Sequence, residues 1–189
     1  MPEHVQTAPQ DALPLHTQRL ALRDFAAEDW FAVHGYAADP EVARYMDWGP
    51  NSDAETRAFI ERVLVIRQAA PRRDFELAIT LRADGRLIGG CGIHVSNPRN
   101  REGWIGYILR RDCWGQGYAS EAARALLGFG FGALGLHRIY ATCDLRNLAS
   151  ARVLEKIGMR HEGHMREHRW QKSAWRDSLL YAILEHELT

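Results

Sequence analysis

The chain has 189 residues, of which 46% are hydrophobic and 25% are charged, and its formal net charge is zero. This composition predicts one globular domain, and the neutral balance predicts neither nucleic acid nor a membrane as a partner. Three cysteines are a poor disulfide framework and favour a cytoplasmic setting. No apolar run reaches the roughly 20 residues of a transmembrane helix. We expect residues 1–14 to form a flexible tail and residues 15–189 a single domain.

The first half of the chain predicts strands interrupted by helices. Alternating apolar and polar residues indicate strands, and apolar residues three or four apart indicate helices. In chain order we expect a strand at 20–25, helices at 26–38, 42–46 and 52–70, and strands at 75–81 and 87–95. Ser52 and Glu55 have the spacing of a capping box. An Asp-Gly pair, Asp84-Gly85, indicates a hairpin turn between the last two strands.

From residue 104 onward, strands and helices alternate before two final strands. We expect a strand at 104–109, a turn at 110–117, a helix at 119–134, a strand at 138–144, a helix at 148–157, and strands at 159–170 and 174–186. Gly128, Gly130 and Gly132 each cost the first of these helices about 1 kcal/mol relative to alanine. About seven mostly antiparallel strands with one β-α-β unit predict a mixed α/β sheet flanked by helices.

The segment Gly115-Gln116-Gly117 lies between a predicted strand and a predicted helix. Glycines let the backbone approach an anion closely, and a helix N-terminus offers unpaired N–H groups with partial positive charge. The pattern indicates a phosphate site, although a plain turn can look the same. A Walker A loop needs Lys and Ser or Thr where Tyr118-Ala119 stands. A dinucleotide fingerprint needs a third glycine, which Ser120 and Glu121 do not supply.

The loop Trp114-Gly115-Gln116-Gly117-Tyr118-Ala119 resembles the Gln/Arg-x-x-Gly-x-Gly/Ala loop of the GNAT superfamily of N-acetyltransferases, with tryptophan in first position. The match is best with the RimJ/RimL-like branch. Other segments resemble that branch in the same order: Leu15–Arg23, Asp39–Tyr45, Ile105–Tyr107, Asn147–Met159 and Trp175–Asp177. The resemblance covers about residues 15–188. It implies the GNAT fold, whose central sheet splays between its fourth and fifth strands.

The resemblance implies transfer of an acetyl group from acetyl-CoA to a primary amine, by direct attack in a ternary complex. The branch name favours a protein or peptide N-terminal amine as the acceptor. An antibiotic or polyamine acceptor is an alternative, and so is a non-catalytic acyl-CoA-binding sensor, because two usual catalytic side chains are missing. The enzyme is expected to be a monomer or a homodimer.

The family's cofactor site carries over to residues near the glycine loop. The loop would hold the pyrophosphate of acetyl-CoA, a backbone N–H near Ile108 or Leu109 would stabilise the acetyl oxygen, and Asn147 would contact the pantetheine arm or cap its helix. The expected cofactor-binding residues are Ile108, Leu109, Trp114, Gly115, Gln116, Gly117, Tyr118, Ala119, Asn147 and Ser150. The arginine that would meet the 3′-phosphate stays open among 72–73, 99–101 and 110–111.

The catalytic groups are expected where the sequence departs from the branch. Trp104 occupies the position of a frequent catalytic carboxylate, so Glu102, two residues away on the same strand face, is the predicted base. His94 and Glu76 on adjacent strands are lesser candidates. Leu154 occupies the position of the superfamily's acid tyrosine, so Ser150 is the predicted acid or sulfur ligand. The side chains expected to shape the acceptor pocket are Trp30, His34, Tyr45 and Trp48.

Two other chemistries are not favoured. Cys113 lies beside two arginines that would activate a thiol, but the sequence shows no histidine and asparagine arranged around it as a catalytic cysteine would need. His161 and His164 would point to opposite faces of a strand, so we expect no metal site.

Overall fold

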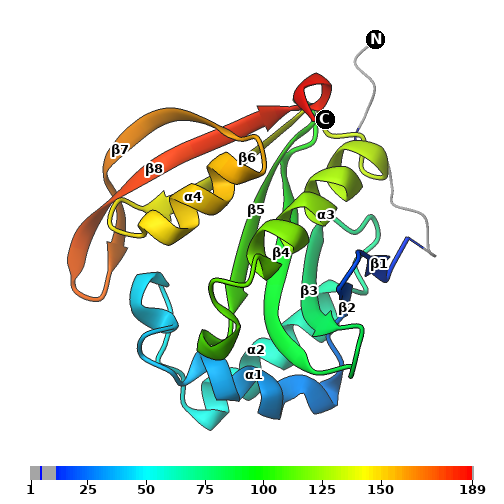
Figure 1. Ribbon diagram of the computed structural model, residues 1–189, viewed down its shortest axis with the longest axis vertical. Coiled ribbons are helices and arrows are strands. Elements are labelled where there is room, and N and C mark those ends of the chain that lie inside the picture. The colour runs from blue at the N-terminus through cyan, green and yellow to red at the C-terminus, as the bar shows by residue number, and fades with distance from the viewer. Residues whose placement is uncertain (1–4, 6–11, 189) are drawn as a thin grey trace.

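The computed structural model describes Val5 and residues 12–188 as one α/β domain (Figure 1). Eight strands form one sheet in the order β1-β2-β3-β4-β5-β6-β8-β7. The strands are β1 (Leu15–His16), β2 (Leu20–Asp24), β3 (Asp74–Leu81), β4 (Leu87–Asn97), β5 (Glu102–Leu109), β6 (Arg138–Asp144), β7 (Arg160–Gln171) and β8 (Ala174–Leu184). The α-helices are α1 (Trp30–Ala37), α2 (Asp53–Ile66), α3 (Tyr118–Gly132) and α4 (Leu148–Lys156). Among the described residues, no helix is long and apolar enough to cross a membrane.

The predicted fold class is confirmed, with differences at single elements. The seven expected strands are present, and the eighth, β1, has only two residues, which is too short to show a pattern. The helix expected at 26–38 is divided into a 3-10 turn and α1, and the helix expected at 42–46 is a 3-10 turn. The Ser52–Glu55 capping box is confirmed and begins α2. Most of the tail expected at 1–14 lies outside the described residues.

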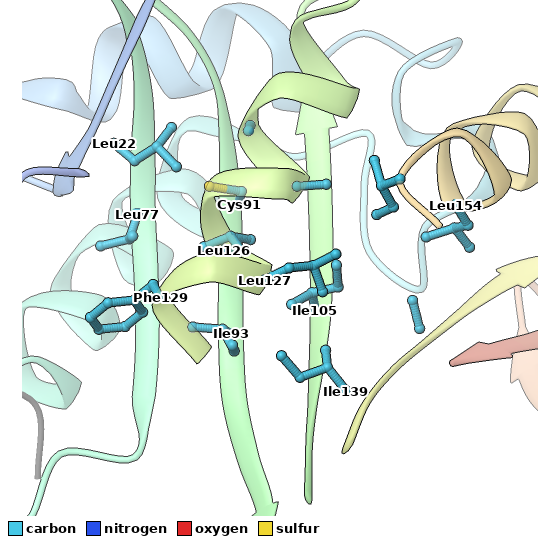
Figure 2. Close-up of a cluster of buried hydrophobic side chains, with 14 of the residues drawn as sticks. Leu22, Leu77, Cys91, Ile93, Ile105, Leu126, Leu127, Phe129, Ile139 and Leu154 are labelled. Carbon is cyan, nitrogen blue, oxygen red and sulfur yellow. The ribbon is translucent and has the colours of Figure 1, made fainter. Parts of the chain in front are cut away.

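Alternation along each strand divides the apolar side chains between the two faces of the sheet. In β3, Leu77 and Ile79 join a large core under α3 and α4, whereas Ala78 joins a smaller core under α1 and α2. Figure 2 shows the large core, where Leu126 and Leu127 from α3 meet side chains of the central strands. The same alternation places polar side chains of one strand on opposite faces.

The pairing of β5 with β6 is short. It is the parallel pair of the sheet and joins three residue pairs, from Glu102 with Arg138 to Trp104 with Tyr140. Beyond these pairs β5 continues beside β4 as far as Leu109, while β6 continues beside β8. The two halves of the sheet therefore separate between the fourth and fifth predicted strands, as the resemblance implied. In Figure 1, α4 and the β7–β8 hairpin lie on one side of β5, and β1–β4 lie on the other.

The glycines of α3 occupy different environments. A Cβ on Gly130 would lie 2.5 Å from Ile93 Cδ1 and 2.6 Å from Ile139 Cδ1. The absence of a side chain at this position therefore lets α3 approach the sheet closely. A Cβ on Gly128 would have no atom within 4 Å. Gly130 therefore has a packing role, whereas Gly128 only weakens the helix.

We predict that Gly128→Ala raises the free energy of unfolding by about 0.5–1 kcal/mol, because alanine loses less backbone entropy in a helix. Gly130→Ala should lower it, because overpacking costs about 1–3 kcal/mol and outweighs the same entropic gain. Urea unfolding of both variants measures the difference. Equal effects of the two substitutions would contradict the packing role of Gly130.

Candidate active site

A cavity of about 1770 Å³ follows the separation of β5 and β6. Residues of β3 to β6, the loop between α1 and α2, the first turns of α3 and α4, and the β7–β8 hairpin line it. It brings together most residues that the sequence singled out: Tyr45, Trp48, Glu102, Ile108, Leu109, Trp114, Gly115, Gly117, Tyr118, Ala119, Asn147 and Ser150. Gln116, Trp30 and His34 lie outside its lining.

The glycine loop has the backbone geometry that an anion site needs. Gly115 and Gly117 have φ angles of +73° and +82°, in the left-handed region that favours glycine. Gly117 is the N-cap of α3, and its carbonyl accepts the bond from Glu121 N that begins the helix. The N–H groups of residues 118–120 precede this bond, and helix geometry gives them no intrahelical acceptor. Such N–H groups can bind a phosphate, as the sequence led us to expect for this loop.

Two side chains of the loop hold its conformation through hydrogen bonds to nearby carbonyls. The Trp114 indole donates to the Leu109 carbonyl at 2.9 Å, which ties the loop to the end of β5. The Gln116 amide donates to the Asp112 carbonyl at 2.9 Å, so it points back into the turn. Trp114 and Gln116 therefore shape the loop through these bonds, and the groups that the loop can offer to an anion are its backbone N–H groups.

Arg19 lies beside the loop, although no role was predicted for it. Its guanidinium donates to the Gln116 carbonyl at 3.0 Å and lies 4.4 Å above the Tyr118 ring. It also pairs with Glu121 at 2.6 Å, the acidic residue in the first turn of α3. Burial acts to raise the pKa of Glu121, but hydrogen bonds from Thr17 and Arg19 outweigh it and lower that pKa. Arg19 thus offsets a negative charge that would repel a phosphate.

Hydroxyl and thiol groups meet on the α3–α4 face of the separation. Ser150, near the start of α4, has its Oγ 3.0 Å from the Tyr107 hydroxyl of β5. Asn147 is the N-cap of α4 and accepts from Ser150 N at 3.1 Å, as expected of a cap. Burial raises the pKa of Tyr107 above its ordinary value, so its phenol keeps its proton. Burial also raises the pKa of the neighbouring Cys143 thiol to about 11.

Tyr107 places a phenol beside Ser150, although the position expected for an acid tyrosine holds Leu154. Leu154, at the position of the superfamily's acid tyrosine, is 1% exposed and packs in the large core (Figure 2). The phenol arrives instead from β5, on the face opposite Trp104. Alternation along the strand could have indicated that Tyr107 faces α4, but its bond with Ser150 depends on long-range packing.

A histidine between two carboxylates lies on the other face of the sheet. His94 Nδ1 is 2.9 Å from Asp74 Oδ1, and His94 Nε2 is 3.5 Å from Glu76 Oε1. The Trp104 ring stacks on His94, with centroids 3.9 Å apart and planes at 16°. Trp104, at the position of the missing carboxylate, thus holds the imidazole in place. Burial raises the pKa of Glu76, although His94 and Arg62 act against it.

Glu102 begins β5 and lines the cavity, on the strand face that was expected. Its Oε2 accepts from Arg138 Nε at 3.1 Å, and the same guanidinium binds both oxygens of Glu162 at 2.8 and 2.6 Å. Glu102 is therefore part of an ion-pair cluster at the point where β5 and β6 are still joined.

Trp30 and His34, two of the side chains expected in the acceptor pocket, lie in settings unlike those expected. Trp30 is covered by the Arg57 guanidinium at 3.4 Å, and His34 binds Thr56 and Asp53, because both face α2. Burial and Asp112 raise the pKa of Cys113, which is unsuited to a nucleophile. The described residues contain no cluster of metal-ligating side chains.

An unpaired strand edge beside an anion-binding loop defines a class of enzymes that take an acyl group from coenzyme A. The acetyltransferase (GNAT) domain model matches residues 19–160, and the chain belongs to the GNAT family. Over 171 residues it is 36% identical to the uncharacterized N-acetyltransferase YnaD of Bacillus subtilis, covering 90% of this chain and 96% of YnaD. The family makes it an acetyl-CoA-dependent N-acetyltransferase.

Solved structures agree with the fold. A GNAT-family acetyltransferase from Bacillus anthracis matches with a TM-score of 0.81 and 35% identity, covering 92% of this chain and 99% of that one. Mycobacterium smegmatis RimJ, in complex with CoA-disulfide, matches with a TM-score of 0.80 and 28% identity, covering 99% of this chain and 90% of that one.

The raised pKa of Glu76 predicts a pH-dependent stability. A carboxyl whose pKa is higher in the folded protein than in the unfolded chain stabilises the fold at low pH, and this contribution is lost as the pH rises through the folded pKa. Glu76→Gln, which is neutral at every pH, should therefore raise Tm at pH 8 by a few degrees and leave it nearly unchanged at pH 4.

Differential scanning calorimetry at the two pH values measures the effect. Glu61→Gln, a change of an exposed carboxylate on α2, is the control and should show no such difference. A lower Tm for Glu76→Gln at both pH values would contradict the prediction.

Proposed function

We propose that the enzyme acetylates the N-terminal amine of a protein or peptide. The observation that carries the proposal is the charge balance of the cavity, whose lining contains seven Asp and Glu and six Arg and Lys residues. A nearly neutral cavity suits an acceptor with a single ammonium, whereas a polyamine would be held better by an excess of carboxylates. The cavity volume of about 1770 Å³ has room for several residues of a peptide.

The name of one relative supports a protein as the acceptor. The Bacillus subtilis protein named putative ribosomal N-acetyltransferase YdaF is 31% identical over 104 residues, which cover 55% of this chain and 57% of YdaF. The likeness to RimJ supports the RimJ/RimL-like branch. Spermidine N(1)-acetyltransferase of Escherichia coli, 24% identical, represents the polyamine alternative.

In the proposed reaction, residues around the separated strands hold the two substrates. Acetyl-CoA supplies the thioester that the amine attacks. The glycine loop and the first turn of α3 hold its pyrophosphate, and the backbone edge of β5 near Ile108 and Leu109 offers donors to the acetyl oxygen and the pantetheine arm. Ser150, supported by the Tyr107 phenol, donates a hydrogen bond to the sulfur as it leaves.

The acceptor ammonium must lose a proton before it can attack. Two carboxylates line the cavity on the same face of the sheet, Glu102 and Glu76. Glu102 as the base, acting through a water, stays a prediction. Its Oε2 already accepts a hydrogen bond from Arg138 Nε at 3.1 Å.

The acceptor is tested with a panel of amines and released CoA thiol as the readout. We expect 10-residue peptides with a free α-amine to be acetylated with higher kcat/KM than spermidine or kanamycin. The same peptides with an acetylated N-terminus and an internal lysine are the matched controls and should be inactive. Higher kcat/KM for spermidine would move the enzyme to the polyamine class. Binding of CoA without thiol release from any amine would favour the sensor.

Ser150→Ala should lower kcat by about 10²-fold, because the departing sulfur loses its donor, while KM for acetyl-CoA changes little. Tyr107→Phe should lower kcat less, because the serine hydroxyl remains. Tyr181→Phe is the matched control: its phenol is buried and also binds a residue of α4, Glu155, at 3.2 Å. Steady-state kinetics measures all three variants. If both Tyr107→Phe and Tyr181→Phe lowered kcat equally, the contact between Tyr107 and Ser150 would have only a structural role.

A further inference from the structure

Asp74, Glu76 and His94 lie on one face of the sheet and form a continuous chain of polar contacts. Asp74 and Glu76 are two residues apart on β3, so their side chains share a face, and His94 is directly opposite Asp74 on β4. The imidazole bridges the two carboxylates through its two nitrogens. This row of polar contacts begins at Glu76 in the cavity and ends at Asp74, whose side chain is 52% exposed.

Glycines on the neighbouring strands make room for the side chains of Glu76 and His94. Gly92 lies opposite Glu76 on β4, and Gly106 lies opposite Gly92 on β5. A Cβ on Gly92 would be 2.8 Å from His94 Nε2 and 3.1 Å from Glu76 Oε2. Gly92 therefore leaves room for the Glu76–His94 pair, and Gly106 lies beside the Trp104 ring, whose Cζ3 would be 3.5 Å from a Cβ at that position; both glycines line the cavity.

We propose that Glu76 is the base that takes the proton from the acceptor ammonium, and that His94 and Asp74 are positioning residues that hold it and stabilise the transferred proton. This inference rests on the proposed amine acceptor and names the residue that deprotonates it. The ammonium, or a water bound to it, lies in the cavity that Glu76 lines and reaches its carboxylate.

The proton balance is simple. The ammonium gives one proton to Glu76 and becomes the free amine that attacks the thioester. Glu76 passes that proton to His94 Nε2 and regains its charge. Asp74 stabilises the resulting imidazolium from Nδ1, the role that a carboxylate has beside a catalytic histidine. After the products leave, the proton passes from the imidazole to water.

The surroundings of Glu76 suit this role. Arg62 of α2 is the cation that faces it besides His94, and Tyr36 of α1 and Cys91 of β4 are neutral groups beside it. Burial raises the pKa of Glu76, which moves it toward the pH at which an amine must be deprotonated. Glu102 differs, because Arg138 binds its oxygen directly.

The test is the pH dependence of kcat for four variants, assayed with a peptide that carries a free α-amine of pKa about 7.7–8.0. Glu76→Gln should lose about 10²-fold at pH 6.5, and the loss should shrink toward pH 9, where the amine is already free. His94→Asn and Asp74→Asn should lower kcat about 10-fold with the same trend and leave KM for acetyl-CoA unchanged. Glu102→Gln should keep the wild-type profile shape.

Asp84→Asn is the matched control. It is the same chemical change on an exposed residue of the β3–β4 hairpin, but at the opposite end, in the turn where Asp84 accepts from Arg86 N at 3.0 Å. This variant should leave both kcat and its pH profile unchanged. A wild-type profile for Glu76→Gln, or a profile changed only by Glu102→Gln, would overturn the proposal. If Asp74→Asn and Asp84→Asn lowered kcat equally, Asp74 would have no specific role in the proposed proton transfer.

A second measurement does not depend on the acceptor. In the free protein, the carboxyl carbon-13 resonance of Glu76 should titrate above the ordinary glutamate range, and His94→Asn should move its midpoint while Asp84→Asn should not. An unmoved midpoint in His94→Asn would show that the two groups are not coupled and would overturn the proposal. If spermidine rather than a peptide proves to be the acceptor, the proposed function fails alone, and the same kinetic series is read with spermidine.

Discussion

The three-residue pairing between β5 and β6 is the constraint on which the site depends. It is long enough to join the two halves of the sheet at one end, where Arg138 also links Glu102 to Glu162. It is too short to pair the backbone of β5 from Ile105 to Leu109 on that side. An unpaired strand edge is usually a liability, but here it faces a cavity and offers donors in a regular row. The same separation places the first turn of α3 beside that edge.

Strand alternation then divides the chemistry between two faces. Tyr107 points toward α4 and Ser150, while Trp104 and Gly106, three residues and one residue earlier, lie on the face toward α1 and α2. The group proposed to meet the sulfur and the groups proposed to meet the amine therefore approach the separation from opposite sides. This arrangement keeps an acidic donor away from a proton acceptor, although both serve one reaction.

Patterns among neighbouring residues predicted the helices, strands and turns, whereas contacts between residues far apart in sequence form the candidate site. The Ser52–Glu55 capping box and the Gly115–Gly117 turn depend on neighbouring residues, and both were predicted. The Tyr107–Ser150 contact and the bridge at His94 join residues far apart in sequence, and no periodicity indicates which strands will be neighbours. Trp30 and His34 were expected in the acceptor pocket from their place in the chain, but they face α2, where Arg57 and Thr56 bind them.

The position of Glu76 shows how stability and chemistry oppose each other in this fold. A carboxylate on a central strand loses hydration, and burial raises its pKa, so the charged form weakens the fold. An apolar residue would serve the small core better. The structure instead keeps glycine at position 92, stacks Trp104 on His94 and leaves Arg62 facing the carboxylate, and each arrangement lowers the cost of the charge. Glu102 needs no such support, because Arg138 lies 3.1 Å from its Oε2 and offsets its charge. The proton acceptor is thus expected at the carboxylate that the fold accommodates least well.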